Sequence, residues 1–197
     1  MAVSTSLTGL EHREGASLAG PLRQDGVVDF ASDRCRLDGP ESALVLDGAT
    51  VYQALRDGRW TRQSGRPGQW SVFHPTWAFE ALRLACGTTE VTAPGRMRVR
   101  LDREPLAAIT FAGLARDWVH ITAEVTLDDR EHVAAVGIDL VAPRANDTDA
   151  RMQVGFELTG FTAAVDIRVP DPARTIDLAQ YLSEAFDTDE WPDSDKR

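Results

Sequence analysis

The sequence predicts an α+β protein with a strongly curved antiparallel β-sheet, a half-barrel, and helices covering its concave face. Three observations support this prediction: apolar and polar residues alternate along several runs, the chain has around ten strand-like runs, and two of three expected helices are too apolar to lie on a surface. Alternation gives a strand one buried and one solvated face, which is typical of antiparallel sheets. A single sheet of that width is expected to curl, and its concave side is the economical place for apolar helices.

Four alternating runs in the second half of the chain are expected to form a meander, because short polar turns separate them. They span residues 119–127, 136–140, 152–158 and 163–169. In the first run, for example, Val119, Ile121 and Val125 are apolar and the residues between them are polar or small. The meander is the most clearly patterned part of the predicted sheet.

Strand signals also fill the first third of the chain. The runs span residues 3–7, 16–22, 27–31, 43–46 and 51–55, and the chain is expected to return as a strand at Trp60. Asp-Gly dipeptides that begin at Asp38, Asp47 and Asp57 are typical of hairpin turns. Residues 88–101 are expected to be strand again.

Three helices are expected. The first begins at His74-Pro75, where proline suits the first helical position, and Gly87 is its expected C′ residue. Because it is apolar over most of its circumference, it should be enclosed. The second begins at Glu104-Pro105; its apolar run 106–115 also permits a buried strand, but the proline and the four alanines favour a helix. The third spans residues 177–186, with apolar residues at helical spacing.

Length and charge restrict the protein further. The 197 residues are expected to form one domain over 1–186, followed by an acidic, frayed tail over 187–197. A net charge of −10 disfavours nucleic acid and anionic membranes as partners. The N-terminus lacks the basic region and apolar core of a secretory signal, which predicts a cytoplasmic protein as written, or a cell-envelope protein if a leader has been removed.

No residue pattern announces a reaction, so we expect neither an enzyme nor a cofactor. Reduced, buried thiols are favoured over a disulfide for Cys35 and Cys86, and neither has the sequence context of an activated nucleophile. The four histidines lack the short spacings of a metal site. The arginines at 96, 98 and 100 either bind an anion or, the favoured interpretation, pair across strands with acids such as Glu124 or Asp166.

Three segments carry a resemblance to a known family. Residues 26–31 (GVVDFA), residues 45–52 (VLDGATVY) and Trp60 resemble the GxVDFA…DGxxVY…W run of actinobacterial lipoproteins of the LppX/LprG type. The helix opening at His74-Pro75 and the strand at 161–170 are similar to segments of that family, and the resemblance spans roughly residues 3–172. It differs in the missing signal peptide, the missing lipid-modified cysteine and the additional helix at 177–186.

The resemblance implies the fold of the periplasmic lipoprotein carrier LolA, a curved sheet closed by helices around a cavity for acyl chains. The first hypothesis is therefore a non-enzymatic binding or carrier protein for a hydrophobic ligand, a lipid or acyl chain, acting as a monomer or weak oligomer. The alternative is a regulatory or scaffolding module whose cavity is filled by side chains and which binds a peripheral protein partner. The expected cavity lining is Val28, Phe30, Val51, Trp77, Leu82, Ile109, Phe111, Ile121, Val154 and Phe156.

Overall fold

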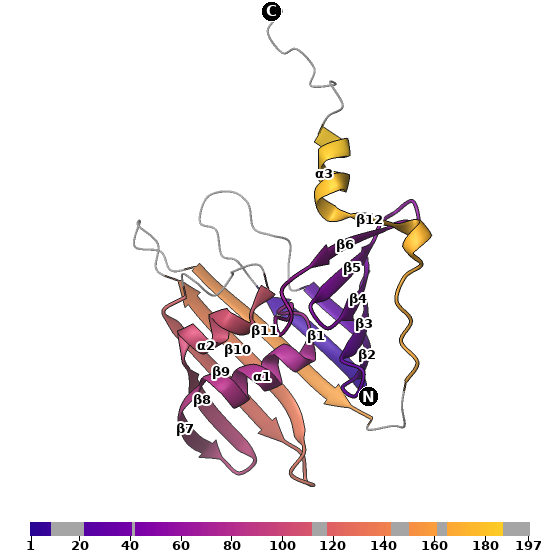
Figure 1. Ribbon diagram of the computed structural model, residues 1–197. Coiled ribbons are helices and arrows are strands. Elements are labelled where there is room, and N and C mark those ends of the chain that lie inside the picture. Colours follow the sequence, from indigo (N-terminus) through magenta and orange to yellow (C-terminus); the bar gives the residue numbers. More distant parts are fainter. Residues whose placement is uncertain (9–21, 41, 112–117, 143–149, 161–164, 187–197) are drawn as a thin grey trace, which may run out of the picture.

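The computed structural model describes residues 1–8, 22–40, 42–111, 118–142, 150–160 and 165–186. It confirms the α+β class and the mostly antiparallel sheet (Figure 1). The strands of the first half are β1 (Ala2–Thr8), β2 (Leu22–Asp29), β3 (Arg34–Asp38), β4 (Ala43–Asp47), β5 (Thr50–Ala54) and β6 (Trp60–Ser64). Those of the second half are β7 (Cys86–Ala93), β8 (Arg96–Leu101), β9 (His120–Leu127), β10 (Val133–Ala142), β11 (Ala150–Thr159) and β12 (Thr175–Asp177).

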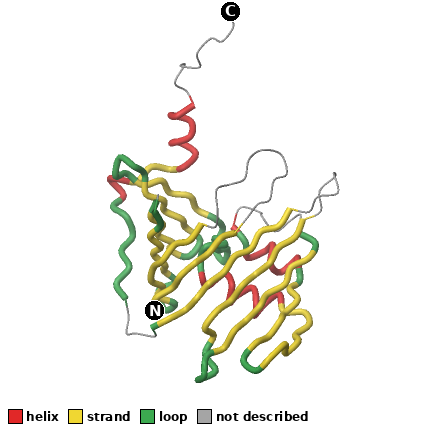
Figure 2. The backbone as a smooth tube through the Cα atoms, turned by 180° about the vertical axis from the view of Figure 1, so that it is seen from behind, coloured by secondary structure: helices red, strands yellow, loops and turns green. Residues whose placement is uncertain are grey.

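Within the described residues these strands form one ladder, in the order β12-β6-β5-β4-β3-β2-β1-β11-β10-β9-β8-β7. Of the strand pairs that the structure describes, only β12–β6 is parallel. Strand β1 joins the two halves of the ladder, because it pairs with β2 on one side and with β11 on the other. Figure 2 shows the sheet from its other side, with the two main helices behind it.

Both of these helices lie in the middle of the chain, in connections between strands. Helix α1 (Pro75–Ala85) precedes β7, and α2 (Arg103–Ile109) follows β8. They pack against each other and lie on the same face of the sheet (Figure 1). The third helix, α3 (Leu178–Phe186), comes after β12 and projects away from the sheet.

Three of the four predicted meander strands are confirmed, as β9, β10 and β11. The fourth prediction is wrong for residues 165–169, which are extended but form no strand. Strand β11 already has a partner on each edge, β10 and β1, so no edge is left for a following strand. Ile167 is nevertheless buried, and its carbonyl oxygen accepts a hydrogen bond from Arg34 Nη1 at 3.4 Å.

Segment 165–170 covers the face of β3 and β4 that is turned away from the helices. Val45 and Ile167 are both buried, yet neither belongs to the main core cluster. Val45 alternates with Leu44 and Leu46, which do belong to it, so Val45 must point to the opposite face. An irregular segment thus takes the place of the predicted closing strand.

The N-terminal strand predictions are largely confirmed, with two corrections. Strand β2 ends at Asp29 rather than extending to residue 31, and β3 is an additional strand whose Cys35 and Leu37 are fully buried. The Asp-Gly turns at Gly48 and Gly58 have positive φ angles of 52° and 81°. The predicted run 16–22 lies outside the described residues except for Leu22.

The expected strand structure at 88–101 is confirmed, and the structure divides it between the two strands of a hairpin. Strands β7 and β8 pair antiparallel across a turn at Pro94-Gly95, where Gly95 has a φ of 69°. Proline lacks the N–H that a ladder needs, and a left-handed glycine reverses the chain at little steric cost.

Helix α1 begins after His74 as predicted, but it is not enclosed on all sides. Trp77, Ala78 and Ala81 are buried, whereas Leu84 is 42% exposed. Gly87 occupies the expected C′ position after the C-cap residue Cys86, but it lies in β7 and does not have the positive φ angle of a left-handed cap. The apolar residues of α1 therefore exceed what its buried face can accommodate.

Helix α2 is confirmed but is shorter than predicted. It ends at Ile109 because Thr110 forms a β-bridge with Trp70; residues 112–115 of the prediction lie outside the described residues. Helix α3 is confirmed, and the expected tail at 187–197 lies outside the described part. Among the described residues, no helix is both long enough and apolar enough to cross a membrane.

Candidate hydrophobic-ligand site

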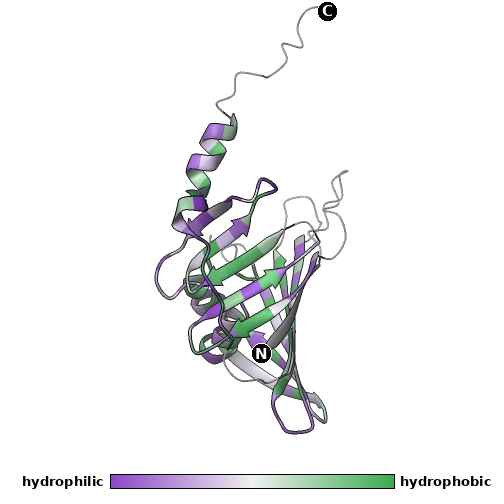
Figure 3. Ribbon diagram, turned by 90° about the vertical axis from the view of Figure 1, so that its right-hand side faces the viewer, coloured by the Kyte–Doolittle hydropathy of each residue, from purple (hydrophilic) through white to green (hydrophobic). Residues whose placement is uncertain are grey.

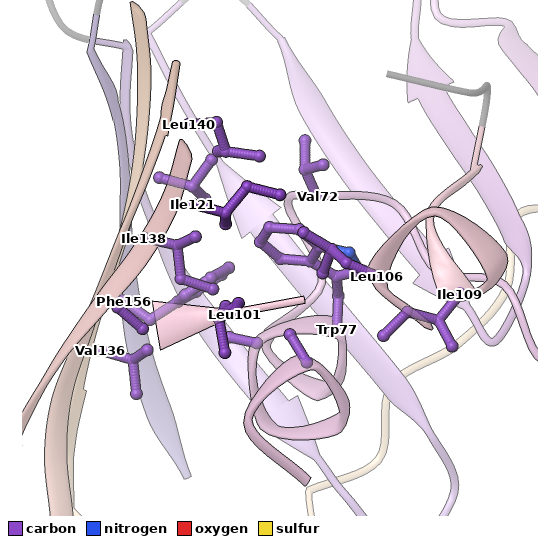
Figure 4. Close-up of a cluster of buried hydrophobic side chains, with 14 of the residues drawn as sticks. Val72, Trp77, Leu101, Leu106, Ile109, Ile121, Val136, Ile138, Leu140 and Phe156 are labelled. Atoms are coloured by element: carbon purple, nitrogen blue, oxygen red, sulfur yellow. The ribbon is translucent and has the colours of Figure 1, made fainter. Parts of the chain in front are cut away.

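Six of the ten predicted lining residues lie in one buried cluster between the helices and the sheet. They are Val28, Trp77, Ile109, Ile121, Val154 and Phe156, none more than 7% exposed. Figure 4 shows Trp77, Leu106 and Ile109 on the helix side, facing Ile121 and Phe156 from the sheet. The structure therefore brings these six together, as a packed apolar interior.

The other four predicted lining residues lie at the margin of this cluster. Val51 and Leu82 are partly buried against it. Phe30 is 40% exposed, because β2 ends one residue before it. The half-buried Phe111 packs against Gly65, where an added Cβ would collide with its ring.

A buried hydrogen-bond chain joins α1 to the end of α2. Trp77 Nε1 donates to Thr110 Oγ1 at 2.9 Å, and Thr110 Oγ1 donates to the carbonyl oxygen of Leu106 at 2.6 Å. Trp70 holds the same end through two backbone hydrogen bonds of 2.8 Å, to Ile109 and from Phe111. Buried polar groups are tolerated when they are paired in this way, so the helices have a fixed relative position at this end.

A second polar cluster fixes the start of α1 to the β2–β3 turn. The side chain of His74 is fully buried, and its Nδ1 accepts the N–H of Thr76 at 3.1 Å as an N-cap. Its Nε2 therefore carries the proton and donates to the carbonyl oxygen of Asp33 at 3.3 Å. Trp70 Nε1 donates to Asp33 Oδ2 at 2.8 Å. Asp33 itself has a left-handed φ of 54°.

One carboxylate oxygen of this cluster has no hydrogen-bond partner in the described part of the chain. It is Asp33 Oδ1, which lies 3.8 Å from His74 Nε2. Burial lowers the pKa of His74, and the nearby charge of Asp33 opposes this shift only partly. His74 is accordingly neutral near neutral pH, with both ring nitrogens occupied by main-chain groups, and it acts as a structural connector.

The cysteines take different environments. Both are free; Cys35 is buried as predicted, whereas Cys86 is exposed. Burial raises the pKa of the Cys35 thiol to about 12, which keeps it protonated and poorly nucleophilic. Among the described residues, no group of three or more His, Cys, Asp or Glu side chains is arranged to hold a metal ion.

The arginine row supports the cross-strand interpretation for one of its members. Arg98 Nη2 lies 2.8 Å from Glu124 Oε1 on the neighbouring strand β9, and both side chains are exposed. Asp166, the other suggested partner, instead forms an ion pair with Arg168 at 3.0 Å. Because residues 165–170 are not a strand beside β8, Asp166 is not its cross-strand neighbour.

Trp118 was not among the predicted site residues and lies in the core. It is 5% exposed, and its Nε1 has no hydrogen-bond partner among the groups that the structure describes. Val119, which the alternation placed on the buried parity, is 44% exposed. The alternation changes phase here because β9 begins only at His120. A tryptophan directly before the alternating run was the available signal.

Protein families and curated proteins offer no relative of this chain. No protein-family model matches the chain, and no curated protein matches it significantly. The candidate site therefore depends on the packing described above.

Proposed function

We propose that this protein is a non-enzymatic binding or carrier protein for a hydrophobic ligand, a lipid or acyl chain. In this proposal the sheet is a strongly curved half-barrel, and α1 and α2 are a cover on its concave face. The ligand would lie between cover and sheet, in the region of Trp77, Ile121 and Phe156. The observation that carries the proposal is the extensive apolar interface between two short helices, of 11 and 7 residues, and a far wider sheet.

Apolar side chains also lie at the margin of the interface between the helices and the sheet. The ring of Phe30 packs edge-to-face on Phe79 of α1, with 5.4 Å between the centroids. Phe79 and Leu82 are one helical turn apart, and both are half-buried against the core cluster. These three residues, which we call the apolar margin, are in this proposal the place where an alkyl chain would approach the interior.

The energetics also favour an apolar ligand. Directional polar contacts join the two helices of the cover at Thr110 and hold the start of α1 to the β2–β3 turn at His74, while the contacts between cover and sheet in the core cluster are apolar. Such contacts are non-directional, so an alkyl chain would replace them with little loss of burial free energy. Burial contributes about 0.8 kcal/mol per CH₂ group, which gives a long chain useful affinity without a specific polar contact.

Titration with a fluorescent dansyl fatty acid tests the proposal. We expect saturable binding that unlabelled fatty acid displaces, and organic extraction of the purified protein should yield lipid. Phe30→Asp should weaken probe binding, whereas the matched Leu84→Asp variant, at a similarly exposed position of α1, should not. A lipid-free protein that never binds the probe, or equal binding by both variants, would argue against it.

The alternative, a regulatory or scaffolding module with a filled interior, also has a specific observation in its favour. Six predicted lining residues are already buried against protein side chains. If the dansyl probe binds only when denaturant loosens the core, the interior is filled and this second function becomes the better one.

A further inference from the structure

Trp118 places a polar group inside the apolar interior between the helices and the sheet. Its side chain is 5% exposed and belongs to the main core cluster. The N–H of Val119 donates to the carbonyl oxygen of Val141 at 2.8 Å, which extends the pairing of β9 and β10 by one step. Ile121, three residues further along, belongs to the same cluster and faces the helices (Figure 4). Trp118 therefore lies at the end of the interface where β9 begins.

The indole nitrogen of Trp118 lacks the partner that two other tryptophans of this interior have. Trp77 Nε1 donates to Thr110 Oγ1 at 2.9 Å. Trp70 Nε1 donates to Asp33 Oδ2 at 2.8 Å. Trp118 Nε1 is buried and has no hydrogen-bond partner in the described part of the chain. Because an unpaired buried donor is costly and native proteins pair nearly all of them, we expect another molecule to supply an acceptor to Trp118.

The chemistry of the indole restricts what that molecule can be. An indole N–H is a donor only, so it requires an acceptor such as a carbonyl or carboxylate oxygen. A buried water typically needs about three polar partners, whereas the cluster to which Trp118 belongs consists of hydrophobic side chains. The acceptor oxygen should therefore come from a molecule that is otherwise apolar, and an acyl group with its alkyl chain has this composition.

We propose that Trp118 Nε1 donates a hydrogen bond to the acyl oxygen of the ligand, while the alkyl chain lies along the core cluster near Ile121 and Phe156. This inference rests on the proposed function and narrows it to fatty acids or their esters, excluding hydrocarbons without oxygen. Apolar contacts are non-directional, whereas a hydrogen bond requires a defined geometry. Trp118 is thus the residue that determines both the class of ligand and the position of its polar end.

NMR of the full chain with tryptophan labelled by nitrogen-15 tests the proposal. The protein is freed of bound lipid on a hydrophobic resin, and the variants Trp118→Phe and Trp70→Phe assign the two indole signals. Hexadecanoic acid, its methyl ester and hexadecane are then added separately from cyclodextrin. We expect the acid and the ester to move the indole proton of Trp118 to lower field, because a hydrogen bond to oxygen deshields it, and hexadecane to cause no such shift. The indole proton of Trp70, already bonded to Asp33, should move little with all three compounds.

The variant Trp118→Phe provides a second measurement, because it retains an aromatic ring and removes the N–H. Affinities are measured by displacement of N-phenylnaphthylamine, an apolar dye without oxygen. The acid and the ester should bind Trp118→Phe about three- to tenfold more weakly than the wild type, and hexadecane should bind both equally. In the matched control Trp70→Phe, which loses an N–H directed at Asp33, the ratio of ester affinity to hexadecane affinity should be unchanged. If Trp118→Phe does not fold, the NMR titration of the wild type decides.

Three outcomes would overturn the proposal. Acyl compounds that bind without moving the Trp118 signal, or that bind equally to the wild type and to Trp118→Phe, would show that the N–H is not used, and the proposed function would stand without it. A Trp118 signal already at low field in the lipid-free protein would assign the acceptor to water or to the chain itself. If none of the three compounds binds, both this inference and the proposed function are wrong.

Discussion

Helices α1 and α3 have similar sequence patterns and opposite environments. Both are short, both carry apolar residues at helical spacing, and an aspartate or histidine side chain caps the start of each. In α1 the apolar face is covered by the sheet, and Trp77 and Ala81 are completely buried. In α3 Leu182 is exposed, and the helix projects from the edge of the sheet (Figure 3).

The difference follows from position in the chain. Helix α1 is inserted between β6 and β7, near opposite ends of the strand order, so its two connections hold it across the sheet. Among the described elements, helix α3 follows the three-residue edge strand β12 and contacts mainly β12 and β6. Periodicity thus identifies an apolar face, while the connections decide whether the protein's own sheet covers it.

The largest expected difference between the two helices concerns Trp77. Trp77→Ala should lower the free energy of unfolding by about 3–5 kcal/mol, because it leaves a large cavity between helix and sheet. It also removes the donor to Thr110, although that hydroxyl keeps its own bond to Leu106. Urea denaturation followed by circular dichroism measures the effect, and a loss below about 1 kcal/mol would show that α1 is not part of the core.

A smaller change in the free energy of unfolding should come from the protonation of His74 at the start of α1. Burial lowers the pKa of His74 below its ordinary value of 6.5, so the unfolded chain takes up a proton first as the pH falls. Stability is therefore fully present above pH 6.5 and is lost below it, by at most about 1.4 kcal/mol per pH unit. His74→Asn keeps a capping side chain and should flatten this part of the profile.

If denaturation curves between pH 5 and 7 show the same slope for the wild type and for His74→Asn, the buried neutral histidine is not the cause.

Substitutions in α3 are expected to change the free energy of unfolding least. Leu182→Ala should change the free energy of unfolding by less than about 0.5 kcal/mol, since its side chain covers little of the core. Deleting residues 178–197 should likewise leave the thermal transition of the remaining chain nearly unchanged. A strongly destabilised deletion variant would mean that α3 completes the fold, and the contrast with α1 would disappear.

Local patterns predicted those parts of the fold that local geometry specifies. Strands β9 to β11 follow from alternation, and α1 follows from His74-Pro75. The strand prediction at 165–169 was wrong because β1, which is far away in the sequence, already occupies the second edge of β11. No pattern within one segment reveals a competition between residues so far apart in the sequence.

The candidate site was predictable to a similar extent. The helix and strand periods identified Trp77, Ile109 and Phe156 as inward-facing residues. They did not show that Phe30, on the same parity as Val28, lies beyond the end of its strand. The hydrogen-bonded cluster of Asp33, Trp70 and His74 was also missed, because Asp33 lies 37 and 41 residues before its two partners and no spacing in the sequence records the contact.

The double pairing of β1 sets the order of events during synthesis. Ala2 pairs with Val27 and with Thr159, so β1 leaves the ribosome long before its second neighbour has been synthesised. The early hairpins of β2 to β6 can form while translation continues, whereas union of the two half-sheets is a late, high-contact-order step. Until then β1 exposes one bare edge, and a chaperone that shields it would raise the yield of native protein.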